Sequence, residues 1–315
     1  MISFLEFEKP IARLEARIAE LRSAAEGDDV DISAELKRLE QKNIDLVAST
    51  YASLTPWQKT QVARHPARPH FRDFVEHAFD EFMPLGGDRN YGDDQAILGG
   101  FARLDGKKIV LIGHEKGHDT ASRLKHNFGM GKPEGYRKAI RLMELAGRFG
   151  LPVVTLVDTS GAFPGVEAEE RGQAEAIARS TEACLALPVP MVSTIVGEGG
   201  SGGAVALASA ERVLMLEHAI YSVISPEGCA SILWRTSEKA SDAAEAMKVT
   251  AQHLKKLGVI DRIVTEPVGG AHRDPVKAAR NLAKVIAEEL NELEMLSPSE
   301  RRDMREERFL QIGSS

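Results

Sequence analysis

A repeated pattern of apolar strand, glycine-containing turn and helix constrains the fold more than any other feature of this sequence. The apolar segment 151–157 continues into the turn 158–162, and the apolar segment 189–196 continues in the same way into the glycine-rich segment 197–204. A helical pattern follows each turn. Two such copies favour a spiral of repeated α/β units over an open doubly wound sheet.

Hydrophobic periodicity predicts the remaining elements. Apolar residues at helical spacing on both sides of the acidic segment 26–29 predict a hairpin of two amphipathic helices. The hairpin either packs on its own domain or serves as a partner-binding arm. Apolar runs and alternation predict strands over 96–104, 108–112, 153–157, 191–196, 212–216 and 260–264. Start and stop signals predict helices from Pro56 and over 71–82, 133–149, 167–187, 203–210, 275–293 and 298–310.

Composition and charge argue against several classes of protein. The 315 residues carry 40 Lys and Arg against 47 Asp and Glu, a formal net charge of −7, which disfavours nucleic-acid binding through overall charge. The first ten residues lack the pattern of a secretory signal, and no apolar run approaches the ~20 residues that span a bilayer. Two cysteines are too few for a four-cysteine zinc site. We therefore expect a soluble, cytoplasmic protein that holds no metal of its own.

The glycine-rich segment fits three incompatible patterns. The first is G-x-G-x-x-G at Gly197, Gly199 and Gly202, with Glu217 further along the chain, and it imitates a dinucleotide-binding fingerprint. The helix predicted to follow has only about two turns. Such a helix is short for a parallel crossover, so this interpretation is disfavoured.

The second pattern, G-x-S-x-G around Ser201, is typical of a nucleophile elbow. Asp242 or Asp261, followed by His272, would complete a serine hydrolase, but no neighbouring signal selects one acid or one histidine. The third interpretation needs no side chain, because glycines at a helix start let backbone N–H groups donate to a developing oxyanion. Tight packing is the simple alternative, although it accounts for two or three glycines rather than five.

Longer segments resemble the alpha subunit of bacterial acetyl-CoA carboxylase carboxyltransferase, and the likeness covers nearly the whole chain. These segments are 129–139, 158–165, 168–173, 197–204, 221–234 and 269–273. The resemblance implies a crotonase-like fold, an α/β superhelix of strand–strand–helix repeats. It places the carboxyltransferase domain and its C-terminal helices over 91–315, and an N-terminal helical region, the hairpin plus linking helices, over 1–90.

The resemblance also implies an activity and its partners. The alpha subunit would transfer the carboxyl group of carboxybiotin to acetyl-CoA, giving malonyl-CoA for fatty acid biosynthesis. Biotin would arrive on a biotin carboxyl carrier protein after its carboxylation by biotin carboxylase, so this chain would bind no cofactor covalently. The site would form with a beta subunit that carries a zinc ribbon, in an assembly of two alpha and two beta subunits.

In such a subunit the backbone N–H groups of Gly202 and Gly203 are expected to form an oxyanion hole for the ureido oxygen of biotin. We expect further substrate contacts from four residues of the two turns: Gly161, Ala162, Gly199 and Gly200. Because biotin's own nitrogen can accept the substrate proton, a carboxyltransferase needs no general base from this chain.

Lys132 and Arg137 belong, with Lys138 and Arg141, to the strongest basic cluster of an acidic chain. They would bind the phosphates of CoA or an acidic carrier surface, and the alternative is a solvated helix face. Two residues depart from the family pattern, since Ser160 stands where proline is usual and Phe163 where tyrosine is usual. We expect the turn that contains Ser160 to be less rigid for that reason.

Two functions of other classes stay open on the sequence alone. A stand-alone hydratase or isomerase for CoA esters would share the fold, but it would need a carboxylate acid/base, and no single carboxylate is indicated. Glu198, inside the glycine-rich segment, is either a catalytic carboxylate or an acceptor for the turn. A scaffold subunit would use its glycines for packing only.

Overall fold

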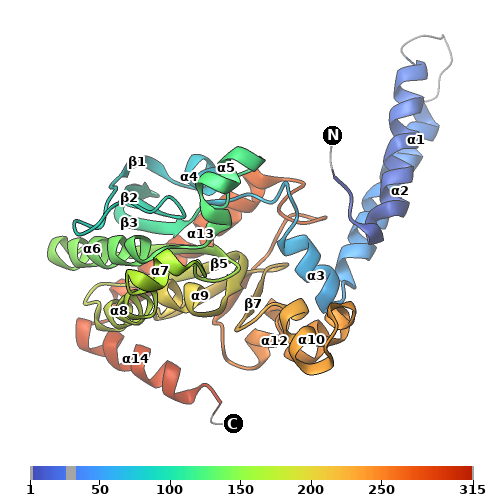
Figure 1. Cartoon of the computed structure of the whole chain (residues 1–315). Coiled ribbons are helices and arrows are strands. Elements are labelled where there is room, and N and C mark those ends of the chain that lie inside the picture. Colours follow the sequence, from blue (N-terminus) through green and yellow to red (C-terminus); the bar gives the residue numbers. More distant parts are fainter. Residues whose placement is uncertain (1–2, 26–32, 314–315) are drawn as a thin grey trace.

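A mixed eight-stranded sheet runs through the residues that the computed structural model describes, 3–25 and 33–313 (Figure 1). Its strands are β1 (Asp80–Pro84), β2 (Ile97–Leu104), β3 (Lys107–His114), β4 (Val153–Thr159), β5 (Met191–Gly200), β6 (Arg212–Leu216), β7 (Ile220–Ser222) and β8 (Arg262–Val264). Their order is β1-β2-β3-β4-β5-β6-β8, and β7 pairs with β5. The pairs β1–β2 and β2–β3 are antiparallel, while the later pairs are parallel.

Helices precede, connect and follow the strands. Within the described ranges they are α1 (Lys9–Ala25), α2 (Ser33–Ala52), α3 (Pro56–Ala63), α4 (Phe71–Ala78), α5 (Thr120–Lys125), α6 (Pro133–Phe149), α7 (Val166–Glu170), α8 (Gln173–Ala186), α9 (Ser201–Ala208), α10 (Pro226–Trp234), α11 (Ala240–Met247), α12 (Ala251–Lys256), α13 (Pro275–Glu294) and α14 (Pro298–Gln311), with the 3-10 turns η1 (Glu6–Glu8), η2 (Asn127–Gly129) and η3 (Ser237–Lys239). The crossovers from β3 to β6 contain α6, α8 and α9. Across the described part of the chain, we find no helix whose length and apolar character would suit a membrane span.

Different helices cover the two faces of the sheet. A Cβ at Gly99 of β2 would lie 2.5 Å from Leu142 of α6, and the cross-strand partner of Gly99 is Ile112 of β3. At the next residue of β3, Gly113, a Cβ would overlap the ring of Phe71 in α4. Because neighbouring residues of a strand point to opposite faces, α6 and α4 lie on opposite sides of the sheet. α8 packs against α6 on the first side, and α13 packs against α4 on the second.

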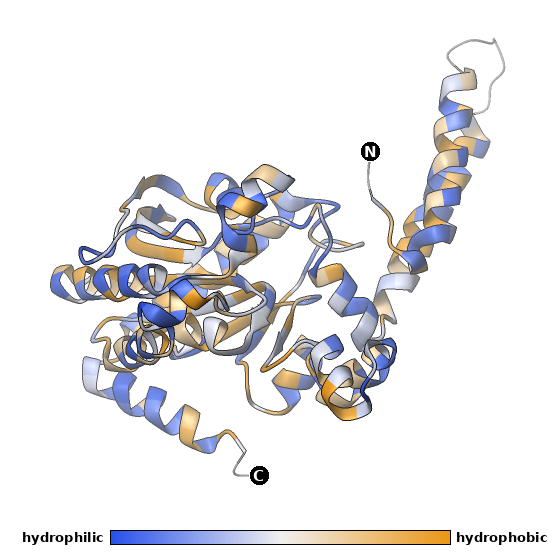
Figure 2. Cartoon of the chain, in the orientation of Figure 1, coloured by the Kyte–Doolittle hydropathy of each residue, from blue (hydrophilic) through white to orange (hydrophobic). Residues whose placement is uncertain are grey.

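α1 and α2 form the predicted hairpin, which extends away from the sheet (Figure 1). Polar and apolar residues are mixed along it (Figure 2). A separate apolar cluster at its base contains Ile11, Val47, Tyr51, Leu54 and Val62. Arg273, just before α13, ties this base to the main body through ion pairs with Glu8 at 3.1 Å and Glu15 at 2.8 Å. The acidic segment 26–29 lies outside the described residues.

Two predicted helices are wrong in extent. The helix predicted over 71–82 ends at Ala78, because Phe79 adopts an extended backbone with φ −130° and ψ 154°, and β1 then pairs with β2. The helix predicted over 167–187 is interrupted at Gly172, whose φ of +80° separates α7 from α8. The domain boundary at residue 90 stays a prediction, and β1 before it pairs with β2 after it.

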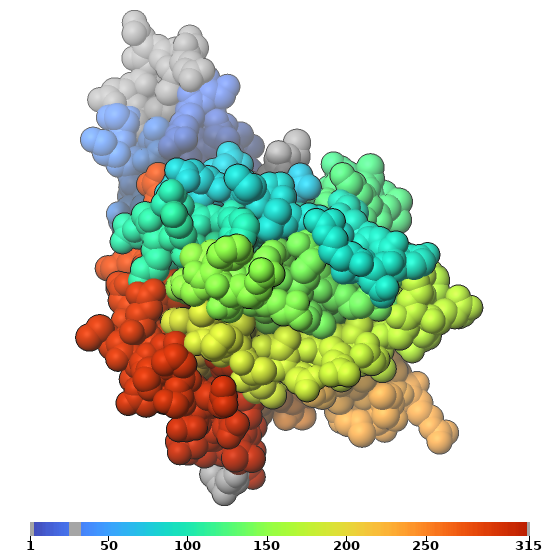
Figure 3. Space-filling view, turned by 90° about the vertical axis from the view of Figure 1, so that its left-hand side faces the viewer, coloured from blue at the N-terminus to red at the C-terminus, as the bar shows by residue number. Residues whose placement is uncertain are grey.

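A buried arginine fixes the C-terminal helix α14 to the main body. The guanidinium of Arg305 is fully buried and donates to the carbonyl oxygens of Leu185 at 2.8 Å and Leu187 at 3.2 Å, at the end of α8. Arg305 also forms an ion pair of 2.5 Å with Glu211, which is itself fully buried. Figure 3 shows the C-terminal segment, in red, against the yellow-green region that contains α8.

We expect Arg305→Ala to lower the free energy of unfolding by about 3–5 kcal/mol, because the change leaves the Glu211 carboxylate buried without its cation. Arg302→Ala, at an exposed position of the same helix, is the control and should change that free energy by less than about 0.5 kcal/mol. Denaturant titration of both variants measures the difference. Equal stability of the two variants would show that the buried ion pair does not fix α14.

Candidate active site

The glycine-rich segment lies where β5 ends and α9 begins. β5 continues through Gly200, and α9 starts at Ser201, earlier than the sequence predicts. Ser201 is exposed and has a φ of +52°, a left-handed backbone that serine seldom adopts. Gly202 and Gly203 therefore belong to the first turn of α9.

The first turn of α9 provides backbone donors. N–H groups in the first turn of a helix have no partner inside the helix, and the helix dipole adds positive potential there. Gly202 and Gly203 supply two of these groups, and no side chain caps them, since the residue before the helix is Gly200. Such a place can stabilise an oxygen atom that gains negative charge.

The turn after β4 packs directly on this helix start. A Cβ at Gly200 would overlap the carbonyl oxygen of Ser160, and a Cβ at Gly203 would lie 2.8 Å from the backbone nitrogen of Ala162. Gly161, in the same turn, has a φ of +150°, which a side chain would strain. The two turns that the sequence predicts to bind substrate are thus in direct contact.

Two aromatic side chains pack behind these glycines. A Cβ at Gly199 would lie 2.7 Å from the ring of Tyr221 on β7, so Gly199 faces that strand. A Cβ at Gly203 would lie 3.1 Å from the hydroxyl of Tyr136, which α6 contributes. Burial raises the pKa of this hydroxyl far above its usual value, so Tyr136 stays neutral.

A buried cluster of charged side chains lies beside the two turns, and we call it the Asp158 cluster. Asp158, near the end of β4, pairs with Lys116 at 2.8 Å and with His70 at 2.9 Å. Lys116 also pairs with Glu198 of β5 at 2.9 Å, and Arg64 after α3 reaches Glu198 at 2.6 Å. The cluster therefore connects the N-terminal helices to both strands that end at the site.

The charges of the Asp158 cluster stabilise one another. Burial alone would raise the pKa of Asp158, but Lys116 and His70 hold it well below its usual range. Burial also opposes the charge on Lys116, yet the two carboxylates beside it raise its pKa. Lys116 and Arg64 in turn lower the pKa of Glu198 against its burial. Glu198 is thus an ionised, paired carboxylate and does not cap the glycine turn.

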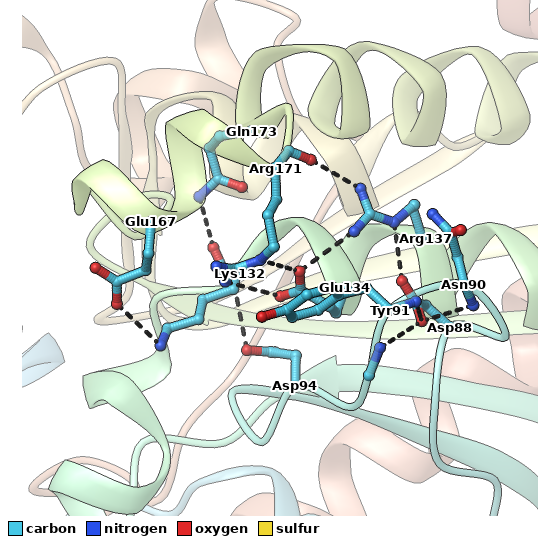
Figure 4. A network of polar contacts seen from close by, with 12 residues as sticks. Asp88, Asn90, Tyr91, Asp94, Lys132, Glu134, Arg137, Glu167, Arg171 and Gln173 are labelled. Atoms are coloured by element: carbon cyan, nitrogen blue, oxygen red, sulfur yellow. Dashed lines mark hydrogen bonds and ion pairs between the residues drawn. The ribbon is translucent and has the colours of Figure 1, made fainter.

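Lys132 and Arg137 lie in a second polar network, beside α6 (Figure 4). The Lys132 ammonium lies 3.3 Å from Glu167 and 4.7 Å from the centre of the Phe163 ring, so it borders the turn after β4. Arg137 donates to Asp88 at 2.9 Å, on the other side of the network. The structure therefore places Lys132 beside the predicted substrate turn and Arg137 further from it.

Other members of the predicted basic cluster hold loops together. The buried Lys138 donates to Asp93 at 2.6 Å, and Arg141 donates to the carbonyl oxygen of Gly87 at 3.0 Å. These cations are used within the fold, so the cluster is not one continuous basic surface.

One group of potential metal ligands lies at the base of the hairpin. The side chains of Glu8, His65 and His272 each place an atom within 4.8 Å of the others. The Nδ1 atom of His65 accepts the N–H of Ala67 at 3.1 Å, and its Nε2 atom donates to the carbonyl oxygen of Ser3 at 2.7 Å. Both nitrogens of His65 are thus used in hydrogen bonds, so this group does not fit a metal ion.

The side chains that a serine hydrolase requires are not brought together. His272 stacks on His65 with 4.0 Å between ring centroids, and Asp261 pairs with Arg308 at 3.1 Å. Neither is recorded in contact with Ser201 among the described residues. The geometry assembles backbone donors and not a catalytic triad.

Comparisons with known proteins show the family of this chain. A model of the family described as acetyl co-enzyme A carboxylase carboxyltransferase-like matches residues 4–313. A curated protein of Erythrobacter litoralis, named acetyl-coenzyme A carboxylase carboxyl transferase subunit alpha, is 82% identical over 313 residues, covering 99% of this chain and 100% of that protein. The chain belongs to this family of alpha subunits. A protein of the same name from Zymomonas mobilis is 65% identical, with the same coverage of both chains.

Solved structures of other proteins share the fold of this chain. Transcarboxylase 12S, solved with methylmalonyl-coenzyme A and methylmalonic acid, has a TM-score of 0.60 at 18% identity, covering 72% of this chain and 42% of that chain. A Pseudomonas malonate decarboxylase hetero-tetramer in complex with coenzyme A has a TM-score of 0.53 at 17% identity, covering 65% of this chain and 82% of that chain. At such identities the likeness shows the fold alone, and the predicted crotonase-like α/β class is confirmed.

The ion pairs of Asp158 with His70 and Lys116 are the part of this alpha-subunit site that the sequence does not predict. Asp158 comes at the end of a buried strand, which is a signal for a side chain at the ligand-binding edge of a sheet. His70 and Lys116 lie far from it along the chain, and no spacing rule connects them.

We expect Asp158→Asn to lower the free energy of unfolding at neutral pH by about 3–5 kcal/mol, since it leaves Lys116 buried with one carboxylate fewer. The folded-state pKa of Asp158 lies below its unfolded value, so its contribution is complete above about pH 4 and is lost as the pH falls further. The variant should therefore lose less stability than wild type between pH 5 and pH 3. Denaturant titrations across this range measure the difference. The exposed control Asp303→Asn should follow wild type, and an unchanged acid dependence in Asp158→Asn would contradict the ion pairing.

Proposed function

We propose that this chain is the alpha subunit of an acetyl-CoA carboxylase carboxyltransferase and that Gly202 and Gly203 bind the ureido oxygen of biotin. The observation that carries the proposal is the uncapped start of α9, where two glycine N–H groups emerge beside the turn at Ala162. Membership of the family over residues 4–313 supports the reaction.

In this reaction the carboxyl group moves from a nitrogen of carboxybiotin to the α-carbon of acetyl-CoA, giving biotin and malonyl-CoA. The nitrogen–carbon bond breaks, a carbon–carbon bond forms, and the proton that leaves the α-carbon passes to the biotin nitrogen. Negative charge builds on the ureido oxygen while the nitrogen–carbon bond breaks. The N–H groups of Gly202 and Gly203 would stabilise this charge, and one such donor typically contributes ~3–4 kcal/mol.

Other residues near the helix start would contact the substrates. The turns in mutual contact contain Gly161, Ala162, Gly199 and Gly200. Lys132 is a cation beside the Phe163 side of these turns and would meet a CoA phosphate. Arg137 would add positive potential at longer range, because its guanidinium is already bonded to Asp88.

The proposal includes the partners that the reaction needs. A beta subunit with a zinc ribbon would supply the donors for the thioester oxygen, in an assembly of two alpha and two beta subunits. A biotin carboxyl carrier protein, charged by biotin carboxylase, would bring carboxybiotin as a substrate, so this chain would hold neither a covalent cofactor nor a metal. The helical region 1–90 would be separate from the carboxyltransferase domain 91–315, and the complex would act in the cytoplasm.

The contacts of the carboxylates disfavour a stand-alone hydratase or isomerase. Such an enzyme needs a carboxylate that exchanges a proton with its substrate. Asp158 and Glu198 are two of the buried carboxylates near the glycine turns, and both are ion-paired with Lys116. Their lowered pKa values keep them ionised at neutral pH, where they cannot act as acids.

The direct test is malonyl-CoA-dependent carboxylation of biocytin, run with this chain alone and with a matching beta subunit. Activity that appears only in the mixture is the expected result, because each subunit would supply one oxyanion site. Conversion of CoA esters by the chain alone would favour the hydratase or isomerase instead. An inactive mixture that forms a stable complex would overturn the proposal.

Gly202→Pro removes one proposed donor and should lower kcat by about 10²–10³-fold. Proline in the first turn of a helix breaks no helical hydrogen bond, but it restricts the left-handed backbone of the preceding Ser201, so the folding of the variant is checked by circular dichroism. The matched control is Gly202→Ala, which keeps the N–H and whose Cβ would lie 3.4 Å from Ile177, an ordinary contact, so it should retain most activity. Turnover is measured in complexes whose assembly has been checked. Wild-type turnover in Gly202→Pro would remove Gly202 from the site.

A further inference from the structure

A cavity of about 260 Å³ opens beside the turn after β4. Its lining residues come from the N-terminal helices, the α5 region and the ends of β4 and β5, and they include Arg64, His70, Lys116, Arg123, Phe128, Ser160 and Glu198. The Ser160 carbonyl oxygen is the atom that lies against Gly200. The cavity therefore borders the backbone contact that fixes the start of α9.

One cation in the lining of this cavity, Arg123, differs from the other two in having no acidic partner among the described residues. Three of its lining side chains, Arg64, Lys116 and Arg123, are cations, and Glu198 is its one acidic side chain. Glu198 is already paired with Lys116 at 2.9 Å and with Arg64 at 2.6 Å. Asp158 and Glu227, which do not line the cavity, also pair with Lys116 and Arg64, whereas the described contacts of Arg123 include no carboxylate.

The end of the Arg123 side chain is open to a ligand. Its Nε atom donates to the carbonyl oxygen of Gly117 at 3.3 Å, and among the described residues no partner is recorded for its two terminal nitrogens. A guanidinium held through Nε presents these two nitrogens as a fork. That fork matches the two oxygen atoms of a carboxylate.

A strained turn places an aromatic ring at the same cavity. Asn127, Phe128 and Gly129 have φ values of +46°, +54° and +79°, and such a backbone is costly for the first two residues. A Cβ at Gly129 would lie 2.7 Å from the carbonyl oxygen of Asp158 and 2.8 Å from Lys116, so the turn is pressed onto the Asp158 cluster. The turn places the half-exposed Phe128 ring in the lining of the cavity.

We propose that this cavity binds the carboxylate group that the enzyme transfers, while that group is attached to carboxybiotin or to malonyl-CoA. Arg123 would bind the carboxylate oxygens, and Phe128 would cover the less polar part of the ligand. The proposal rests on the function proposed above. Carboxybiotin donates the carboxylate in the forward reaction and malonyl-CoA donates it in the reverse reaction, so both ligands carry this group. Ser160 lies between the cavity and the glycine-rich segment. A carboxylate bound in the cavity would therefore lie beside the proposed donors, the N–H groups of Gly202 and Gly203.

The test compares ligands that differ only in the carboxylate, using the complex of this chain with its beta subunit. One arm measures dissociation constants for malonyl-CoA and acetyl-CoA, and the other measures them for the carboxylated and the uncarboxylated carrier protein. Arg123→Gln should raise the dissociation constant of the carboxylated ligand in one pair by about tenfold or more. This is the usual effect of losing a charge-assisted hydrogen bond. The uncarboxylated member of that pair should bind as before, and the affected arm identifies the source of the carboxylate.

Lys125→Gln, an exposed cation on the same helix, is the matched control and should leave all four constants unchanged. Arg123→Lys keeps the charge and should recover part of the lost affinity. The carboxylate site would be overturned if Arg123→Gln weakened the binding of both ligands of a pair equally, or weakened the binding of neither. Because these arms measure binding, a wild-type complex that binds its ligands without turnover would count against the proposed function alone.

Discussion

The close contact between two backbone turns is the constraint on which the rest of the site depends. Gly200 lies against the carbonyl oxygen of Ser160, and Gly203 lies against the peptide nitrogen of Ala162. A side chain at either glycine would push the turns apart, so α9 starts at a fixed place relative to the turn after β4. A fixed start also fixes the direction of the N–H groups in its first turn. Donors that are already oriented stabilise a developing oxyanion without reorganising during the reaction.

Buried charges keep these two turns in register. Asp158 occupies the space that a side chain at Gly197 would need, and it accepts the backbone N–H of Glu198 at 3.0 Å. Because Lys116 bridges Asp158 of β4 and Glu198 of β5, sliding of β4 along β5 would separate buried opposite charges. Breaking a buried pair costs about 3–5 kcal/mol, since the remaining charge loses its partner where water cannot replace it. The cluster thereby couples the position of the N-terminal helices to the position of the proposed oxyanion donors.

The sequence predicts the parts of this structure that depend on local pattern, such as α6 and the apolar core of β4, and the glycine segment already pointed to backbone donors. It fails where distant strands decide the outcome. The segment before Pro84 has a spacing of aromatic residues that also fits a helix, and only its pairing with β2 makes it a strand. The glycines to Gly200 were predicted as a turn, but pairing with β7 extends β5 through them. The partners of Asp158 are likewise set by tertiary packing alone.

A site formed by backbone atoms accommodates the two departures from the family pattern. Ser160 contributes its carbonyl oxygen to the contact with Gly200 and exposes its side chain, so the absence of proline changes the stiffness of the turn and not its contacts. The ring of Phe163 packs against Gly165 and lies under the Lys132 ammonium, and neither contact needs a hydroxyl group. The proposed chemistry depends on where the backbone lies, so neighbouring side chains would affect it only as far as they move the turn.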